Sequence, residues 1–505
     1  MEASKAIKNA VPATDVGVMG STAVSLAAER PSPVPHDAGR EQSRVDANAL
    51  GYGSVAGYRA PGLTNGYLPE PAFLHLAPTA IGYVDLDEPL EIHQPAAPAP
   101  QAECHDALLM VRAHGEPLAI IHTYEPLERV SAETLAAAIW DQCAEAIRAH
   151  CEHFACCRPP ANAADLLAGL VTGADGCPGA RPRRGGASVT VVIPTGGRPR
   201  KLERCLGSLC ELDYAPFDVV VVDNKPERPG TEHVVAAFVD RLSVRYVAEP
   251  RPGSSVARNR GVAETAAELV AFADDDVVLD RGWLGWLLDP FADPRVSATA
   301  GMILPLELQT ESQKRLEQYA GFSKGVGAHT YDLSEHRARN RLLYPYWGGV
   351  FGSGASAAFR RAQFVAAGGF DTALGTGTPA RAGADIDAFT TTVLHGDQVV
   401  YQPRAVSWHE HTRDPDGLRR TLFDYGVGFS AIMTKHLTHD ARFLAALTRS
   451  IPLALAGRDR PSAQARLPRA LARVERRGML CGPWLYGRSR RWARTLRLSD
   501  VIAQR

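Results

Sequence analysis

The middle of the chain alternates short apolar runs with amphipathic stretches. The runs are rich in Val and other β-branched residues, and they predict strands at 189–193, 219–222, 244–247, 269–272 and 298–304. The stretches between them predict helices at 199–212, 231–239, 255–267 and 282–288. This alternation is typical of an α/β fold with a mostly parallel sheet covered by helices, in which ligands bind beyond the carboxyl ends of the strands.

The regions on either side have other patterns. Residues 1–72 lack a sustained apolar period, so we expect a mostly disordered arm there. Residues 73–176 predict a small α+β accessory unit, with a hairpin of strands 107–113 and 118–123 and a helix over 131–150 that Ser131 caps. A linker at 177–187 leads into the α/β domain at 188–437, and a helical, basic C-terminal region follows at 438–505.

Composition and charge narrow the class of protein. The 505 residues are 45% hydrophobic and 22% charged, as in ordinary globular proteins, and the net charge of −1 argues against a nucleic-acid partner. No apolar run reaches 18 residues and no secretory leader is visible, so we expect a cytoplasmic protein. The nine Cys include no Cys-x-x-Cys pair, which argues against a zinc cage or a disulfide framework and favours reduced structural thiols.

Candidate ligand-binding residues follow the first two predicted strands. Asp223 comes directly after one strand and can accept a hydrogen bond from a nucleobase, although it can equally be an ordinary turn residue. The other strand leads into a loop with Pro194, Thr195 and Arg198, whose small neighbours allow the backbone to approach a base or ribose. A generic turn is the alternative for this loop.

Two further segments carry charge to the same edge of the sheet. Residues 252–261 place a flexible loop and Arg258 at a helix start, where backbone N–H groups and a guanidinium favour a diphosphate; a solvated surface helix is the alternative. Strand 269–272 then leads into Asp274, Asp275 and Asp276. Adjacent carboxylates repel one another, and a hard divalent cation that bridges them to phosphate oxygens relieves this repulsion.

The last candidates lie further along the chain. A Gly-rich run at 347–359 predicts backbone in close contact with a ligand or a tight turn. Asp385, near the start of an amphipathic helix, can be a general base or a cap. His409 follows the predicted strand 398–401 and can be a third metal ligand or a hydrogen-bonded structural residue.

These motifs in this order resemble the family 2 nucleotide-sugar glycosyltransferases with a GT-A fold, over roughly residues 188–437. They read Val-Val-Ile-Pro-Thr, Val-Val-Asp-Asn, Pro-Gly-Ser-Ser-Val-Ala-Arg-Asn-Arg-Gly, Ala-Phe-Ala-Asp-Asp-Asp-Val, Phe-Gly-Ser-Gly-Ala, Gly-Ala-Asp-Ile-Asp and Trp-His-Glu-His. The resemblance implies that Asp223 contacts the base and Arg258 the diphosphate, that Asp274 and Asp276 form the Asp-x-Asp pair at ribose and metal, that Asp385 is the catalytic base, and that His409 completes the metal shell.

The implied reaction inverts the anomeric carbon of a nucleoside-diphosphate sugar, with Mg²⁺ or Mn²⁺ as cofactor and a saccharide, lipid-linked or other hydroxyl as acceptor. One departure is visible: the family commonly has Glu-Asp where this chain has Ala384 and Asp385. Asp387 should point to another face of the helix. A segment over 321–346 is a candidate lid over the donor.

Two other functions are alternatives to a glycosyltransferase: a non-catalytic nucleotide-sugar binding protein and a sugar-phosphate nucleotidyltransferase.

The C-terminal tail is strongly basic. From residue 461 to the end it has eleven Arg and no Lys, against Glu475 and Asp500. Apolar and aromatic residues lie among the Arg, a composition that favours an anionic membrane surface and predicts peripheral contact with the inner face of the cell membrane. The alternative is that these Arg pair with the catalytic domain or lie on a solvated face, because Pro461, Pro468 and Pro483 interrupt any long helix.

Overall fold

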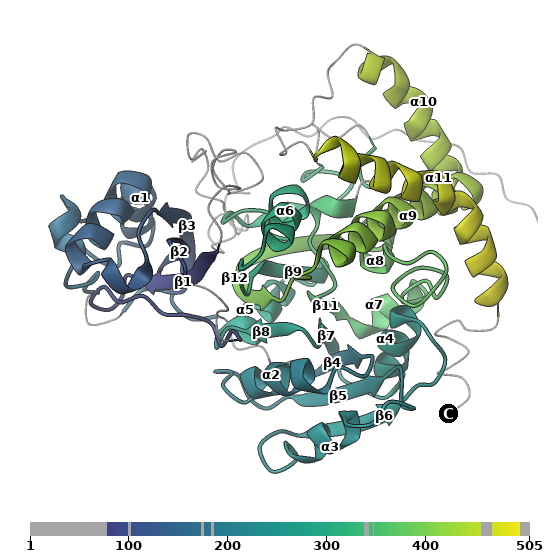
Figure 1. Cartoon of the computed structure of the whole chain (residues 1–505), viewed down its shortest axis with the longest axis horizontal. Coiled ribbons are helices and arrows are strands. Elements are labelled where there is room, and N and C mark those ends of the chain that lie inside the picture. The colour runs from purple at the N-terminus through teal and green to yellow at the C-terminus, as the bar shows by residue number, and fades with distance from the viewer. Residues whose placement is uncertain are drawn as a thin grey trace, which may run out of the picture. The chain divides into compact units, whose positions relative to one another are not determined.

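The computed structural model describes residues 78–98, 103–172, 176–182, 186–337, 343–346, 348–455 and 467–494. The predicted N-terminal arm, residues 1–72, lies outside this part of the chain, as does part of the candidate lid. The described residues all belong to one compact unit, Ala47–Arg505. They form a three-stranded sheet and a nine-stranded sheet with helices packed against both (Figure 1).

The first half of the large sheet is parallel, as the apolar runs predict. Its strands are β4 (Val189–Thr195), β5 (Asp218–Asp223), β6 (Val244–Ala248) and β7 (Leu269–Ala273), in the spatial order β7-β4-β5-β6. The helices that connect them are α2 (Pro199–Leu209), α3 (Thr231–Ala236) and α4 (Ser254–Ala263). The predicted strands and helices are confirmed here, with ends that differ by a few residues. Strands β4, β5 and β7 are buried along nearly their whole length, which explains their continuous apolar runs.

The second half of the sheet is mixed. The strands are β8 (Val277–Leu279), β9 (Val296–Pro305), β10 (His329–Tyr331), β11 (Ser356–Arg360) and β12 (Gln398–His409), with α5 (Trp283–Leu288), α6 (Glu311–Ala320), α7 (Arg361–Ala366) and α8 (Ala384–Leu394) between or beside them. Strand β11 is antiparallel to both of its neighbours, β7 and β9. The sequence pattern did not predict β11, because its small residues resemble the Gly-rich run that leads into it.

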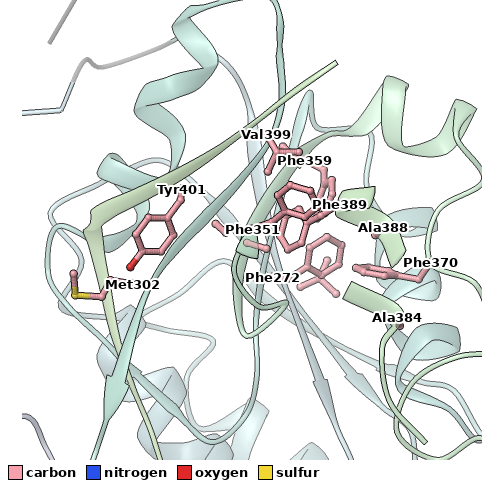
Figure 2. Packing of buried hydrophobic residues seen from close by; sticks show 14 of the residues in the cluster. Phe272, Met302, Phe351, Phe359, Phe370, Ala384, Ala388, Phe389, Val399 and Tyr401 are labelled. Atoms are coloured by element: carbon pink, nitrogen blue, oxygen red, sulfur yellow. The ribbon is translucent and has the colours of Figure 1, made fainter. Parts of the chain in front are cut away.

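An aromatic cluster fills the space between this sheet and α8 (Figure 2). Phe272 of β7 lies edge-on to Phe370 at 5.1 Å between ring centroids, and Phe359 of β11 stacks on Phe389 of α8 at 5.4 Å. Ala384, at the start of α8, is only 2% exposed and belongs to the same cluster. The cluster fixes the N-terminal end of α8 against strands β7 and β11 of the large sheet.

The accessory sheet has the order β1 (Thr79–Asp85), β2 (Asp106–Ala113) and β3 (Glu116–Thr123), and α1 (Ala132–Phe154) covers one face. The predicted hairpin is confirmed, and Ser131 caps α1 by accepting a hydrogen bond from the Thr134 amide at 3.2 Å. Apolar residues of the other face, such as Met110 and Ile120, belong to the same cluster as Leu304 and Trp408 of the large sheet. The small sheet therefore shares a core with the large one.

The C-terminal region is more regular than its prolines suggested. Helices α9 (Pro415–His439) and α10 (Ala441–Leu455) precede α11 (Arg469–Trp492), and Pro483 lies inside α11, so the prediction that it interrupts the helix is wrong. Packing explains the difference: a Cβ atom on Gly478 or Gly482 would collide with α9, so the two helix backbones are in close contact. None of the helices in the described part of the chain combines the length and apolar character needed to cross a bilayer.

Candidate active site

Strands β4 and β5 bring the first predicted residues together at their carboxyl ends. Pro194 and Thr195 lie in β4 itself, because the strand runs two residues further than predicted, and Thr195 pairs in register with Asp223 of β5. The Asp223 carboxylate is buried, and it accepts hydrogen bonds from the Lys225 amide at 2.9 Å and the Tyr246 hydroxyl at 3.3 Å. Burial, followed by the charge of Asp223, raises the pKa of Tyr246 to about 12, so this hydroxyl remains a donor.

Helix α4 brings Arg258 to the same edge. Its buried guanidinium donates a hydrogen bond to Asp274, while its Nε atom has no partner within the described residues. The loop before α4 is fixed from β5, because the Asn224 side chain accepts a hydrogen bond from the Gly253 amide at 2.8 Å and donates to the carbonyls of Glu249 and Arg251. The arrangement leaves a buried donor, Arg258 Nε, beside the carboxylates.

The three consecutive carboxylates after β7 have different surroundings. Asp274 is partly exposed, whereas Asp275 is fully buried and accepts a hydrogen bond from the Thr195 hydroxyl at 2.6 Å. Arg198 bridges the pair, with contacts to Asp275 and an Nη1 hydrogen bond to Asp276 at 2.6 Å. Burial, and then the charge of Asp276, raise the pKa of Asp275, while Arg198 opposes this shift.

Asp276 and His409 meet at the junction of β8 and β12. Their Oδ1 and Nε2 atoms are 3.4 Å apart. Burial opposes ionisation, but His409, Arg198 and Lys201 hold the pKa of Asp276 well below its usual range. Burial would likewise lower the pKa of His409, but the Asp276 carboxylate outweighs it and the pKa is raised. Asp276 is therefore an ionised carboxylate at neutral pH.

The position of His409 differs from the prediction. It is the last residue of β12 rather than part of a following loop, and it pairs with Val277 and Pro305 on the neighbouring strands. The predicted strand ended at Tyr401, before an irregularity in β12 between Gln402 and Val406. A relay orients the ring, since His409 Nδ1 lies 3.1 Å from His411 Nδ1, and His411 Nε2 lies 2.6 Å from Glu317.

The donor set of Asp276 and His409 fits a divalent cation. Two ligands about 2.1–2.2 Å from one ion at a right angle are ~3.0 Å apart, close to the distance observed here. A carboxylate oxygen and an imidazole nitrogen both suit Mn²⁺, and Mg²⁺ is commonly held by one or two carboxylates plus substrate phosphates. Within the described residues no third His, Cys, Asp or Glu completes the group. Phosphate oxygens and water would have to supply the other ligands.

Asp385 lies at the N-terminal end of α8. One carboxylate oxygen accepts hydrogen bonds from the Gly354 amide at 2.8 Å and the Ser353 hydroxyl at 3.3 Å, and the other accepts from the Ile386 amide at 2.9 Å. A Cβ atom on Gly354 would lie 2.9 Å from Asp385 Cβ, so the Gly-rich run allows this approach. These bonds hold a half-buried carboxylate in one orientation. They suit a general base and a helix cap alike.

Asp387 has a different place. It is buried on another side of α8, where its carboxylate binds Lys435 at 2.6 Å, and the same Lys435 contacts Asp371 at 3.0 Å. The negative charge of Asp387 is therefore paired with Lys435 within the core.

Lys201, Arg204 and Tyr425 also belong to the surroundings of the site, and the sequence did not predict them. Lys201 of α2 lies 3.6 Å from Asp276 and 3.2 Å from Glu410, which also binds Arg204. Tyr425 of α9 belongs with them: burial raises its pKa, and the carboxylates of Asp385, Glu317 and Asp276 add to the shift. The i, i+3 spacing of Arg198, Lys201 and Arg204 was a usable signal, whereas nothing local marks Tyr425.

The fold and this edge define a class: an α/β protein whose acidic and cationic side chains gather at the carboxyl ends of its strands, as in GT-A-like sheets. Residues 190–365 match the family Glycosyl transferase family 2. This part of the chain is therefore a family 2 glycosyltransferase domain. It contains Asp223, Arg258 and the three consecutive carboxylates, whereas Asp385 and His409 lie beyond the matched residues.

Similar proteins are also glycosyltransferases. The pre-mycofactocin glycosyltransferase of Mycobacterium tuberculosis is 29% identical over 251 residues, 49% of this chain and 48% of that protein. The validoxylamine A glucosyltransferase of Streptomyces hygroscopicus is 37% identical over 109 residues, 21% of this chain and 24% of that protein. The chain thus spans about half the length of the first of these relatives and a smaller part of the second. The structure of the mannosyltransferase PcManGT from Pyrobaculum calidifontis, in complex with GDP-Man and Mn²⁺, aligns with a TM-score of 0.38 and 21% identity over 64% of this chain and 86% of that one.

Proposed function

We propose that the protein transfers a sugar from a nucleoside-diphosphate sugar to an acceptor hydroxyl with inversion at the anomeric carbon. The observation that carries this proposal is the pairing of Asp276 with His409 beside Arg198 and Arg258 at one sheet edge. A carboxylate and an imidazole suit a divalent cation, and the two guanidinium groups suit a diphosphate. Metal and cations together favour a nucleoside-diphosphate leaving group over other anions.

Each residue has a separate task in this reaction. Asp223 accepts a hydrogen bond from the base, and Asp274 contacts the ribose while Arg258 binds a phosphate oxygen. Asp276 and His409 would hold Mg²⁺ or Mn²⁺, which supplies charge stabilisation of the departing diphosphate. Asp385, fixed by the Gly354 amide, takes the proton from the acceptor hydroxyl as the new glycosidic bond forms.

Donor turnover tests the proposal against its two alternatives. Donor nucleotide sugars are first screened by thermal shift with Mn²⁺, because a bound donor raises the midpoint by mass action. Turnover of the best donor is then measured with candidate acceptors. Release of nucleoside diphosphate that depends on the acceptor supports the transferase. Pyrophosphate exchange would indicate a nucleotidyltransferase, and binding without turnover would indicate a nucleotide-sugar binding protein.

We also propose that α11 holds the protein at an anionic membrane surface. The helix carries seven Arg and one acidic residue, Glu475, which is hydrogen-bonded to Tyr319. A row of exposed residues at helical spacing runs along it: Arg473, Arg477, Leu480, Trp484, Arg488 and Arg491. Leu480 is 83% and Trp484 is 64% exposed, with Arg on both sides of them. Such a row can insert its apolar residues between lipid headgroups while each Arg contributes about 1 kcal/mol of attraction.

Point variants test this better than a truncation would, because removal of α11 uncovers the face of α9 against which it packs. Sedimentation with anionic and neutral vesicles is measured at two salt concentrations. The double variant Leu480→Ser, Trp484→Ser should lose salt-sensitive binding to anionic vesicles. Val239→Ser, which alters another exposed apolar residue, should retain it. Equal pelleting of the wild type and the double variant would exclude insertion of Leu480 and Trp484 as the contact.

A further inference from the structure

Four buried side chains with metal-binding atoms converge within the accessory unit. His114 lies at the turn of the β2–β3 hairpin, His150 in the last part of α1, Cys156 just beyond α1, and Cys177 in the segment that leads to the large sheet. All four are at least nine-tenths buried, and one ligand atom of each lies within 4.8 Å of the others. Among the described residues this is the one group of three or more such ligands.

The distances within the group are close to those of a tetrahedral ion site. His114 Nδ1 lies 2.9 Å from His150 Nε2, Cys156 Sγ lies 3.6 Å from His114 Nδ1, and Cys177 Sγ lies 3.9 Å from His150 Nε2. Zinc bonds of about 2.0–2.1 Å to nitrogen and about 2.3 Å to sulfur give tetrahedral edges of ~3.3–3.8 Å. The observed separations lie around this range. Two imidazoles and two thiolates are also a donor set that favours zinc over hard cations.

The backbone bends sharply where the ligands enter the group. His114 has a φ of 51°, and Ala155, directly before Cys156, has a φ of 47°. Among the described residues only one other non-glycine residue, Arg381, has a positive φ. The left-handed region costs a non-glycine residue of order 1 kcal/mol or more, so surrounding interactions must stabilise these two positions. Metal bonds to His114 and Cys156 would supply that stabilisation.

The neighbours of His150 match those of a metal-bound histidine. Its Nδ1 atom lies 2.8 Å from Glu116 Oε2, so an N–H at this position donates to the carboxylate and leaves Nε2 free to bind an ion. Arg404 of β12 donates to the same carboxylate at 2.9 Å and to the Gly179 carbonyl at 2.6 Å. These bonds connect the group to the large sheet.

We propose that His114, His150, Cys156 and Cys177 form a structural zinc site. The ion fastens the hairpin turn, the end of α1 and the segment before the catalytic domain to one another. This departs from the expectation based on Cys spacing, because the ligands come from separate segments and no Cys-x-x-Cys pair is involved. The site is distinct from the proposed catalytic cation, which would have an oxygen ligand and open positions for substrate.

Neighbouring thiols provide matched controls. Cys157 Sγ lies 3.6 Å from Cys156 Sγ and 2.8 Å from Cys151 Sγ, so it is close to the group without belonging to it. Cys143 is buried in the middle of α1, where its thiol donates to the Ile139 carbonyl. Replacement of either one by Ser changes a buried thiol and spares all four ligands.

The test begins with the metal content of the full chain, purified under reducing conditions. We expect one zinc per chain, with X-ray absorption showing two sulfur ligands at about 2.3 Å and two nitrogen ligands at about 2.0–2.1 Å. Cys156→Ser and Cys177→Ser should lose zinc, whereas Cys143→Ser, Cys157→Ser and the active-site variant Asp276→Asn should retain it. The wild-type absorption measurement decides the question even where a ligand variant fails to fold.

Several results would overturn the assignment. One is a wild-type chain without zinc after growth with added zinc and reconstitution. Another is an X-ray absorption spectrum in which no sulfur atom is bound to the zinc. A third is a wild-type chain that holds two iron atoms and no zinc. Loss of zinc from Cys157→Ser but not from Cys156→Ser would refute this ligand set.

Discussion

The two candidate metal sites of this molecule differ in physical character. The candidate active site combines an ionised carboxylate, Asp276, with the imidazole of His409, and the cations Arg198 and Lys201 contact the same carboxylate. The accessory group has nitrogen and sulfur atoms alone, all buried. A hard ligand set with open positions suits an ion that works on a substrate, whereas a closed, soft set suits an ion that holds a fold together.

This contrast has a consequence for substitutions. Changes at the candidate active site should reduce activity and leave the fold stable, because we propose that those charges bind substrate and metal. Changes around the accessory group should reduce stability first, because its side chains join separate segments of the chain. The distinction would fail if variants of the first group lowered stability, or if variants of the second group lowered activity alone.

The largest expected effect is that of Asp385→Asn. Loss of the proposed general base should reduce the single-turnover rate by about 10²–10⁴-fold and leave donor affinity unchanged, since the base acts only when the acceptor proton moves. Asp397→Asn, beyond the other end of α8, is the control. A rate within a few-fold of wild type would mean that another residue is the base.

Asp276→Asn should abolish the metal dependence of donor binding. Without the ionised ligand, we expect donor affinity in Mn²⁺ to fall by at least about tenfold and to become insensitive to EDTA. Calorimetric titration of donor with Mn²⁺ or EDTA measures this, with Asp416→Asn, whose carboxylate is exposed, as the control. Unchanged affinity and metal dependence would remove Asp276 from the metal site.

Arg404→Met tests the accessory side. It leaves the Glu116 carboxylate without its arginine partner, so we expect a loss of about 2–3 kcal/mol in the free energy of unfolding. Arg241→Met removes an exposed contact with Glu211 and the contact of the guanidinium with the Phe238 ring, and it should change stability by less than about 1 kcal/mol. Chemical denaturation of both variants gives the comparison. Equal stabilities would show that the Glu116 contact does not join the two sheets.

Ala384→Glu should have the smallest effect on activity, and it separates the effect of packing from that of chemistry. The substitution restores the pair common in the family, but Ala384 is buried against the aromatic cluster in this fold (Figure 2). We expect overpacking to cost about 1–3 kcal/mol of stability without a gain in turnover, while Ala384→Ser stays near wild type. A rise in acceptor turnover at unchanged stability would instead indicate that the missing Glu had weakened an enzyme.

The sequence alone determined the parallel half of the sheet and the donor-side residues. Apolar strands buried on both faces have continuous runs that are visible in a short window, and the residues after parallel strands must share one edge. Asp223, Arg258 and the three consecutive carboxylates therefore came together as expected. The accessory hairpin and the Ser131 cap were also predictable, because both depend on neighbours a few residues away.

Tertiary structure alone decided the rest. His409 was placed beyond a strand because an irregularity in β12 hides that strand's second half, and Tyr425 carries no local mark at all. Pro483 lies within α11 because glycines allow close packing on α9, which outweighs the local cost of a proline. The accessory group shows the same limit most clearly: His114 and Cys177 are far apart in sequence, and only the fold brings their ligand atoms together. Short-range patterns record what a residue does with its near neighbours, and contacts between distant segments leave no such record.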